Sequence, residues 1–154
     1  MPNKRTPTGE ALTDLVLETF RLNGEMLDAG NRLTKPHGLT SARWQVMGAI
    51  DLAGQPLTVA QIARRMGLAR QGVQRIVNDL QSIGMVVLQD NLDHKRAPLV
   101  SISTDGNLAI EAVNKAQIAW INQLSEGLSE RPIRQALKIL RAVRERSEEV
   151  DPTQ

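Results

Sequence analysis

Side chains able to pair with nucleic-acid bases recur at helical spacing between residues 70 and 80. They are Gln71, Gln74, Arg75 and Asn78, with Arg70 just ahead of them. Glutamine and asparagine amides can pair with the edge of adenine, and arginine can pair with guanine. A 100° helical step puts these side chains on one face, opposite an apolar stripe. That stripe consists of Val73, Ile76, Val77 and Leu80. The alternative interpretation is a polar helix face that contacts only solvent.

The local charge favours the first interpretation. The whole chain has a net charge of only +2, which does not by itself indicate a polyanionic partner. Between Val59 and Asn78, however, there is no acidic residue. The same segment contains four arginines, Arg64, Arg65, Arg70 and Arg75. Such a basic segment is typical of a surface that approaches phosphates.

A second basic cluster, His94, Lys95 and Arg96, lies between two short apolar runs. The runs, residues 85–88 and 99–102, predict two strands joined by a polar tip, which is a β-hairpin. A basic hairpin tip can contact phosphates or enter the minor groove of DNA. The alternative is an ordinary solvated loop. For His94, a phosphate contact or a solvated position is favoured over a metal-binding role.

These side chains need two packed helices and the hairpin to position them. Thr58 is a good N-cap for a helix that ends at Gly67, and a second helix runs from about residue 69 to 82. Ala63 allows close helix approach, and Val73 anchors the second helix. Two helices joined by a glycine turn and followed by a hairpin predict a winged helix-turn-helix, here at about residues 39–103.

Long amphipathic helices are predicted on both sides of this unit, at about residues 10–35 and 105–149. Their apolar faces are too extensive for a small winged domain to cover, so they predict dimerisation helices and a homodimer. The fold class is therefore mainly α with a small β-hairpin wing. We expect residues 1–9 to form a flexible tail and residues 10–150 to form a single domain.

The sequence lacks the motifs that other classes of function require. The chain has no cysteine, which excludes disulfides, thiolate zinc sites and a cysteine nucleophile. His37 and His94 are the only histidines and have no metal-site spacing. Neither a glycine-rich nucleotide loop nor a nucleophile elbow is present. We therefore expect no enzymatic activity, no metal and no cofactor. Without a long apolar run or a signal-like N-terminus, we expect a cytoplasmic protein with no membrane contact.

Three stretches resemble the multiple-antibiotic-resistance regulator (MarR) family of bacterial transcription factors. They are residues 38–47 (GLTSARWQVM), 57–66 (LTVAQIARRM) with the helix that follows, and 95–106 (KRAPLVSISTDG). The resemblance covers the architecture from about residue 12 to 145. It implies a homodimeric repressor, held by its first and last helices, that binds a palindromic operator in double-stranded DNA. It also implies a small-molecule pocket between the dimerisation helices and the DNA-binding part.

Two residues depart from the family pattern. The family's wing usually reads Asp-x-Arg, but here the triplet is His94-Lys95-Arg96 and Asp93 comes one place early. A wing ion pair between the aspartate and the arginine is therefore in question. The family often has a serine at the N-cap of the recognition helix, where this chain has Ala69.

The implied pocket points to Trp44 and His37 as ligand-binding residues for an aromatic or phenolic effector that would release the DNA. The alternative is that the protein has no effector. For Trp44, core packing is favoured over pocket lining. The absence of cysteine removes a thiol-based peroxide sensor. The alternative function is a winged-helix module for protein–protein contact or for non-specific architectural DNA binding.

Overall fold

A computed structural model describes residues 4–151 of the chain. It consists of two compact units, the first ending at Ala116 and the second beginning at Gln117. Helix α5 (Thr104–Leu124) runs through this boundary. The predicted fold class is confirmed, since helices dominate and the strands form one small antiparallel sheet.

The first unit opens with helix α1 (Pro7–Thr34), which begins three residues before the predicted start at residue 10. The side chain of Thr6 caps it, because its Oγ1 accepts a hydrogen bond from Gly9 N–H at 3.0 Å. Pro7 then fits the first helical position, which needs no N–H donor. The predicted flexible tail is therefore wrong for residues 7–9, and residues 1–3 lie outside the described part of the chain.

Helix α2 (Ser41–Ala53) follows a single turn of 3₁₀-helix, η1 (Lys35–His37). Residues 39–41 are predicted to supply the N-cap of this helix, and Thr40 does so. Asn31 of α1 accepts a further hydrogen bond from Ser41 N–H at 2.8 Å. The sequence predicts an apolar face made of Trp44, Val46, Met47, Ile50 and, near the helix end, Leu52. Of these residues, Val46, Met47 and Ile50 are buried. The prediction that Leu52 joins this apolar face is wrong, since it is 88% exposed. Two helical steps from Ile50 carry it to the opposite side of the helix.

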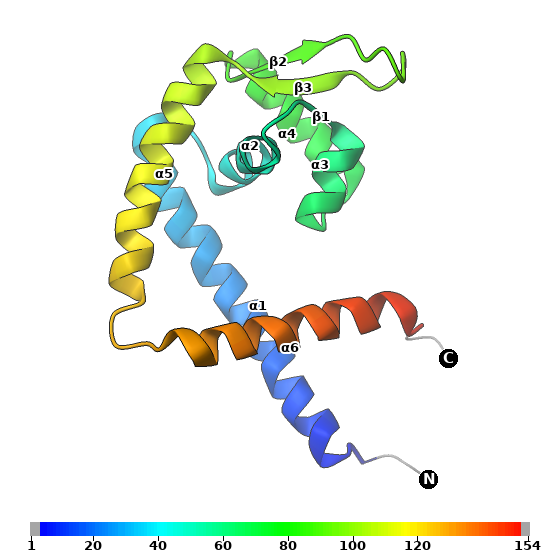
Figure 1. Cartoon of the computed structure of the whole chain (residues 1–154), viewed down its shortest axis with the longest axis vertical. Helices are drawn as coiled ribbons and strands as arrows, with labels where there is room; N and C mark the ends of the chain where they lie inside the picture. Colours follow the sequence, from blue (N-terminus) through cyan, green and yellow to red (C-terminus); the bar gives the residue numbers. More distant parts are fainter. Residues whose placement is uncertain (1–3, 152–154) are drawn as a thin grey trace. The chain divides into compact units, whose positions relative to one another are not determined.

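The winged unit follows with strand β1 (Leu57–Thr58), helices α3 (Val59–Met66) and α4 (Arg70–Ser82), and strands β2 (Val86–Gln89) and β3 (Leu99–Ile102). The predicted hairpin is confirmed as the antiparallel β2–β3 pair. The sequence did not predict β1, which pairs Leu57 with Val100 and Thr58 with Leu99. The resulting sheet has the order β1-β3-β2, and Figure 1 shows it beside α2, α3 and α4.

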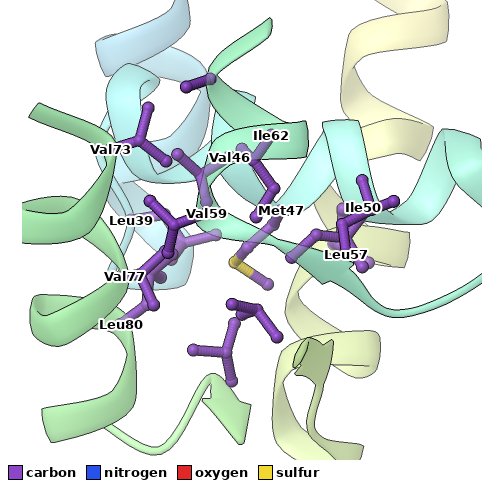
Figure 2. Packing of buried hydrophobic residues seen from close by; sticks show 14 of the residues in the cluster. Leu39, Val46, Met47, Ile50, Leu57, Val59, Ile62, Val73, Val77 and Leu80 are labelled. Atoms are coloured by element: carbon purple, nitrogen blue, oxygen red, sulfur yellow. The ribbon is translucent and has the colours of Figure 1, made fainter. Parts of the chain in front are cut away.

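One hydrophobic core holds these elements together. It contains residues from α2, α3, α4, all three strands and the start of α5. Figure 2 shows Met47 of α2 between Val77 of α4 and Leu57 of β1. All three are at most 1% exposed, so α4 has little freedom to move against α2 and the sheet.

The junction between the sheet and α5 depends on a close backbone approach. Ser103 Oγ donates to the Gly84 carbonyl at 2.6 Å and accepts from Gly106 N–H at 3.0 Å. Ser103 N–H donates to the Met85 carbonyl at 3.0 Å. A side chain on Gly106 would collide with that carbonyl. Glycine is therefore required where the first turn of α5 crosses the segment leading into β2.

The second unit contains the remainder of α5 and helix α6 (Glu130–Glu149). Gly127, with φ 78°, lies in the turn between them. From the sequence, Gly127 and Pro132 are expected to bracket a turn, with the last helix beginning at about Ile133. Pro132 instead lies in the first turn of α6, where proline is tolerated. The helix therefore begins three residues before the predicted start at Ile133. Within residues 4–151, no helix is both long and apolar enough to span a membrane.

Candidate nucleic-acid interface

Helix α4 presents the predicted polar face to solvent. Val73, Val77 and Leu80 are completely buried, and Ile76 is half-buried. The predicted base-pairing side chains are all exposed, namely Arg70, Gln71, Gln74, Arg75 and Asn78. The core therefore fixes the backbone of α4 while its other face stays free.

Two local features set the direction of α4. Thr58 and Gln61 form a capping box at the start of α3, where Gln61 N–H donates to Thr58 Oγ1 at 3.2 Å and Thr58 N–H donates to Gln61 Oε1 at 2.8 Å. Gly67 ends α3 in the left-handed conformation, with φ 63°. That conformation favours glycine and turns the chain sharply into α4.

A contact between α2 and α4 was not predicted from the sequence. Arg43 Nη2 lies 3.9 Å from Asp79 Oδ2, and both side chains are partly exposed. Asp79 follows Asn78 directly and places one acidic group beside the polar face. The separation of 36 residues gives no sequence signal for this pair, because only the tertiary packing of α2 on α4 brings them together.

The wing brings Arg96 to the helix-turn-helix. One small hollow of about 50 Å³ is lined by side chains from the start of α3, from α4 and from the wing. The lining residues are Thr58, Val59, Ala60, Arg70, Gln74, Arg96, Ala97 and Pro98. Two guanidinium groups and one amide, predicted separately from the sequence, therefore share one surface depression. The other lining residues, which were not predicted as site residues, are Thr58, Val59, Ala60, Ala97 and Pro98.

Hydrogen bonds within the wing shape its tip. Asn91 Nδ2 donates to the Ala97 carbonyl at 2.8 Å, and Ala97 N–H donates to the His94 carbonyl at 2.9 Å. His94, Lys95 and Arg96 are exposed. Among the described residues, Asp93 and Arg96 form no ion pair, consistent with the one-residue displacement of the aspartate. The charge of Arg96 is therefore not neutralised by Asp93.

The remaining predicted residues lie outside the hollow. Arg64 and Arg65 are exposed on the last turn of α3, with Arg64 one turn after Ala60 on the same helix face. Gln71, Arg75, Asn78, His94 and Lys95 are exposed but do not line it. Ala69 occupies the N-cap of α4 and provides no side-chain acceptor, as predicted.

Trp44 packs against the core and also joins a polar chain between α2 and α5. Its indole Nε1 donates to Asn114 Oδ1 at 3.4 Å, and Asn114 Nδ2 donates to Asp51 Oδ2 at 3.3 Å. This position supports the core interpretation of Trp44. His37 is half-buried in η1. Within residues 4–151, no group of three or more histidine or acidic side chains could hold a metal ion.

Comparison with known proteins identifies the family. A model of the MarR family matches residues 37–97. The uncharacterized protein Rv2011c of Mycobacterium tuberculosis is 34% identical over 119 residues, which are 77% of this chain and 82% of that protein.

Two solved structures share the fold at lower identity. A cysteine-to-serine mutant of MarR from Escherichia coli, complexed with operator DNA, has a TM-score of 0.76 and 20% identity, covering 86% of this chain and 95% of that one. The organohalide-sensing regulator RdhR, in its 2,4-dichlorophenol-bound form, has a TM-score of 0.77 and 16% identity, covering 95% of this chain and 88% of that one. The winged helix, the family match and these relatives agree: the chain belongs to the MarR family of transcription regulators.

Proposed function

We propose that the protein is a sequence-specific repressor that binds double-stranded DNA through α4 and the wing. The observation that carries this proposal is the hollow at which Arg70 and Gln74 of α4 lie together with Arg96 of the wing. Guanidinium groups suit phosphates and guanine edges, and the glutamine amide suits adenine. The fold shared with an E. coli regulator complexed with operator DNA supports the same use of this surface.

In this proposal the site residues divide into two roles. Gln71, Gln74, Arg75 and Asn78 lie in the major groove and read bases, because they project from the exposed face of α4. Arg64, Arg65, Arg70, His94, Lys95 and Arg96 approach the phosphates or the minor groove, because they surround that face at the ends of α3, α4 and the wing. Only the base-reading group would then carry sequence preference.

The proposed assembly is a homodimer. On α1, Leu12, Leu17 and Phe20 are exposed, and Phe20 is 68% exposed. On α6, the exposed residues Ile133, Leu137 and Leu140 repeat at intervals of four and three, which places them on one helix face. Apolar faces of this extent are typical of surfaces buried by a partner. A second copy of the chain would cover them, with residues 10–35 and 105–149 serving as the dimerisation helices of a single domain.

Two-fold symmetry then predicts the operator. Two copies of α4 would enter successive major grooves on one side of the duplex, about 34–36 Å apart, and so would require an imperfect palindrome. Release of the DNA by a small aromatic or phenolic ligand is the proposed regulation, with Trp44 and His37 near the ligand. The 2,4-dichlorophenol-bound form of RdhR supports this class of ligand.

The test is a binding comparison followed by a footprint. Fluorescence anisotropy should give a higher affinity for the intergenic DNA beside the protein's own gene than for random duplex at the same salt concentration. Footprinting on that DNA should show a protected region with dyad symmetry. Equal affinity for both duplexes would support an architectural role instead, and an unpaired half-site bound at full affinity would contradict the dimer.

A further inference from the structure

Two of the proposed base-reading side chains are hydrogen bonded to each other. Nε2 of Gln74 donates to Oδ1 of Asn78 at 2.9 Å. Both residues are exposed and lie one helical turn apart on α4. Val73 and Val77, on the other side of the helix, are completely buried and fix the backbone beneath the pair. The two amides are therefore held relative to each other before any DNA arrives.

The bond determines which polar groups remain for a ligand. A primary amide has one carbonyl oxygen and two N–H donors. Gln74 uses one of its donors on Asn78, so it keeps Oε1 and one N–H. Asn78 has its carbonyl engaged and keeps both N–H groups. Gln74 thus presents one acceptor and one donor, whereas Asn78 presents mainly donors.

We infer that Gln74 and Asn78 act as one reading unit rather than as two independent contacts. This inference rests on the proposed function and specifies its base preference. Adenine presents N7 as an acceptor and N6 as a donor in the major groove, which matches the groups left on Gln74. Guanine, with N7 and O6, and thymine, with O4, present acceptors that match the donors of Asn78.

The spacing places the two contacts one or two base pairs apart. Four residues of α-helix rise about 6 Å, and successive bases on one strand are about 3.4 Å apart. The pair therefore selects an adenine and, one or two steps away, a guanine or thymine. Because Asn78 orients the Gln74 amide, removal of Asn78 should also weaken selection of the adenine.

A double-mutant cycle on the footprinted intergenic duplex tests this coupling. Affinities are measured for wild type, Gln74→Ala, Asn78→Ala and the double variant, on the native duplex and on duplexes with single base-pair changes. Each single variant should bind about tenfold more weakly, and the double variant should also bind about tenfold rather than about a hundredfold more weakly. Gln81→Ala, which changes an exposed glutamine on the last turn of the same helix, is the matched control and should bind like wild type.

A third substitution separates orientation from base contact. Asn78→Asp keeps an oxygen that accepts from Gln74 but removes both amide donors. Its added charge should lower affinity for all duplexes, yet adenine discrimination by Gln74 should persist while discrimination at the neighbouring guanine or thymine disappears. In Asn78→Ala, both discriminations should fall.

Two results would overturn the reading unit while leaving the proposed function intact. One is that wild type binds the intergenic duplex specifically, but the losses of affinity in Gln74→Ala and Asn78→Ala add up in the double variant. The other is unchanged adenine discrimination in Asn78→Ala. If wild type binds the intergenic and random duplexes equally, the proposed function itself fails and the reading unit fails with it.

Discussion

Replacing Gly106 with alanine should destabilise the first unit, although alanine normally stabilises a helix. A Cβ at this position would lie 2.8 Å from Ile102 Cγ2, 3.1 Å from the Met85 carbonyl carbon and closer still to the Met85 carbonyl oxygen. Favourable contacts between carbon atoms need about 3.5–4.0 Å. The start of α5 must therefore move away from the segment leading into β2.

The size of the effect follows from three contributions. Overpacking costs about 1–3 kcal/mol. Lengthening the Ser103 N–H to Met85 carbonyl bond, now 3.0 Å, costs about 1 kcal/mol. The helix propensity of alanine returns about 1 kcal/mol. The net destabilisation is about 1–3 kcal/mol, which corresponds to a fall in Tm of about 2–12 °C for a chain of this size.

Thermal denaturation followed by circular dichroism at one fixed protein concentration measures the change. Gly48→Ala is the matched control, because Gly48 is in the interior of α2 and nothing lies within 4 Å of its added Cβ. Its Tm should stay level or rise by a few degrees, as alanine gains about 1 kcal/mol over glycine in a helix. If both variants have the same Tm, the backbone at Gly106 has room and the close-approach argument is wrong.

Three further predictions concern the α4 cap, the dimer and the ligand. Ala69→Ser should raise stability by about 0.5–2 kcal/mol, because a serine hydroxyl can accept an N–H of the first turn of α4; an unchanged Tm in the same melting assay would contradict this. Light scattering should give about twice 17.0 kDa for wild type, and a monomeric wild type would refute the dimer. Leu137→Glu should shift the mass towards 17.0 kDa, while the control Gln135→Glu should leave it doubled. In one titration of wild type, 2,4-dichlorophenol should quench tryptophan emission and release DNA. Trp44→Phe should abolish the quenching while Trp120 still emits, and quenching that persists in this variant would place the pocket away from Trp44.

Local sequence signals predicted most of the helices and their starts. Thr58 was predicted as an N-cap and is confirmed, and Thr40 is the N-cap within the predicted capping segment 39–41. Both could be predicted because capping depends on a side chain and the backbone three residues later. The short apolar run at residues 99–102 predicted β3, because this pattern is also local in the sequence. The predicted start of α1 was too late, because residues 7–9 have no apolar periodicity. They are helical because Thr6 caps the helix and Pro7 fits its first position.

Features that depend on contacts between residues far apart in the sequence could not be predicted from the sequence pattern. Strand β1 has only two residues and exists because Leu57 and Thr58 pair with Val100 and Leu99. The requirement for glycine at position 106 arises from the approach of the Met85 carbonyl, 21 residues earlier. Neither feature produces a repeating pattern in its own segment.

The candidate site likewise combines features that the sequence predicts with features that depend on the tertiary structure. The exposed face of α4 followed from its helical period, so its residues could be named in advance. The shared position of Arg70 and Arg96 could not, because it depends on how the β2–β3 loop returns beside α3 and α4. The bond between Gln74 and Asn78 was compatible with their spacing, but their spacing alone does not establish a donor and an acceptor.

The salt dependence of DNA binding by Arg96→Ala tests most directly whether α4 and the wing form one DNA-binding surface. Because the substitution removes one phosphate contact, the slope of log affinity against log salt concentration should become shallower by about 0.9. Affinity should fall equally on the intergenic and random duplexes. Lys115→Ala, which removes one exposed positive charge from α5, should retain the wild-type slope. An unchanged slope and affinity in Arg96→Ala would contradict the account, because the wing would then lie away from the DNA.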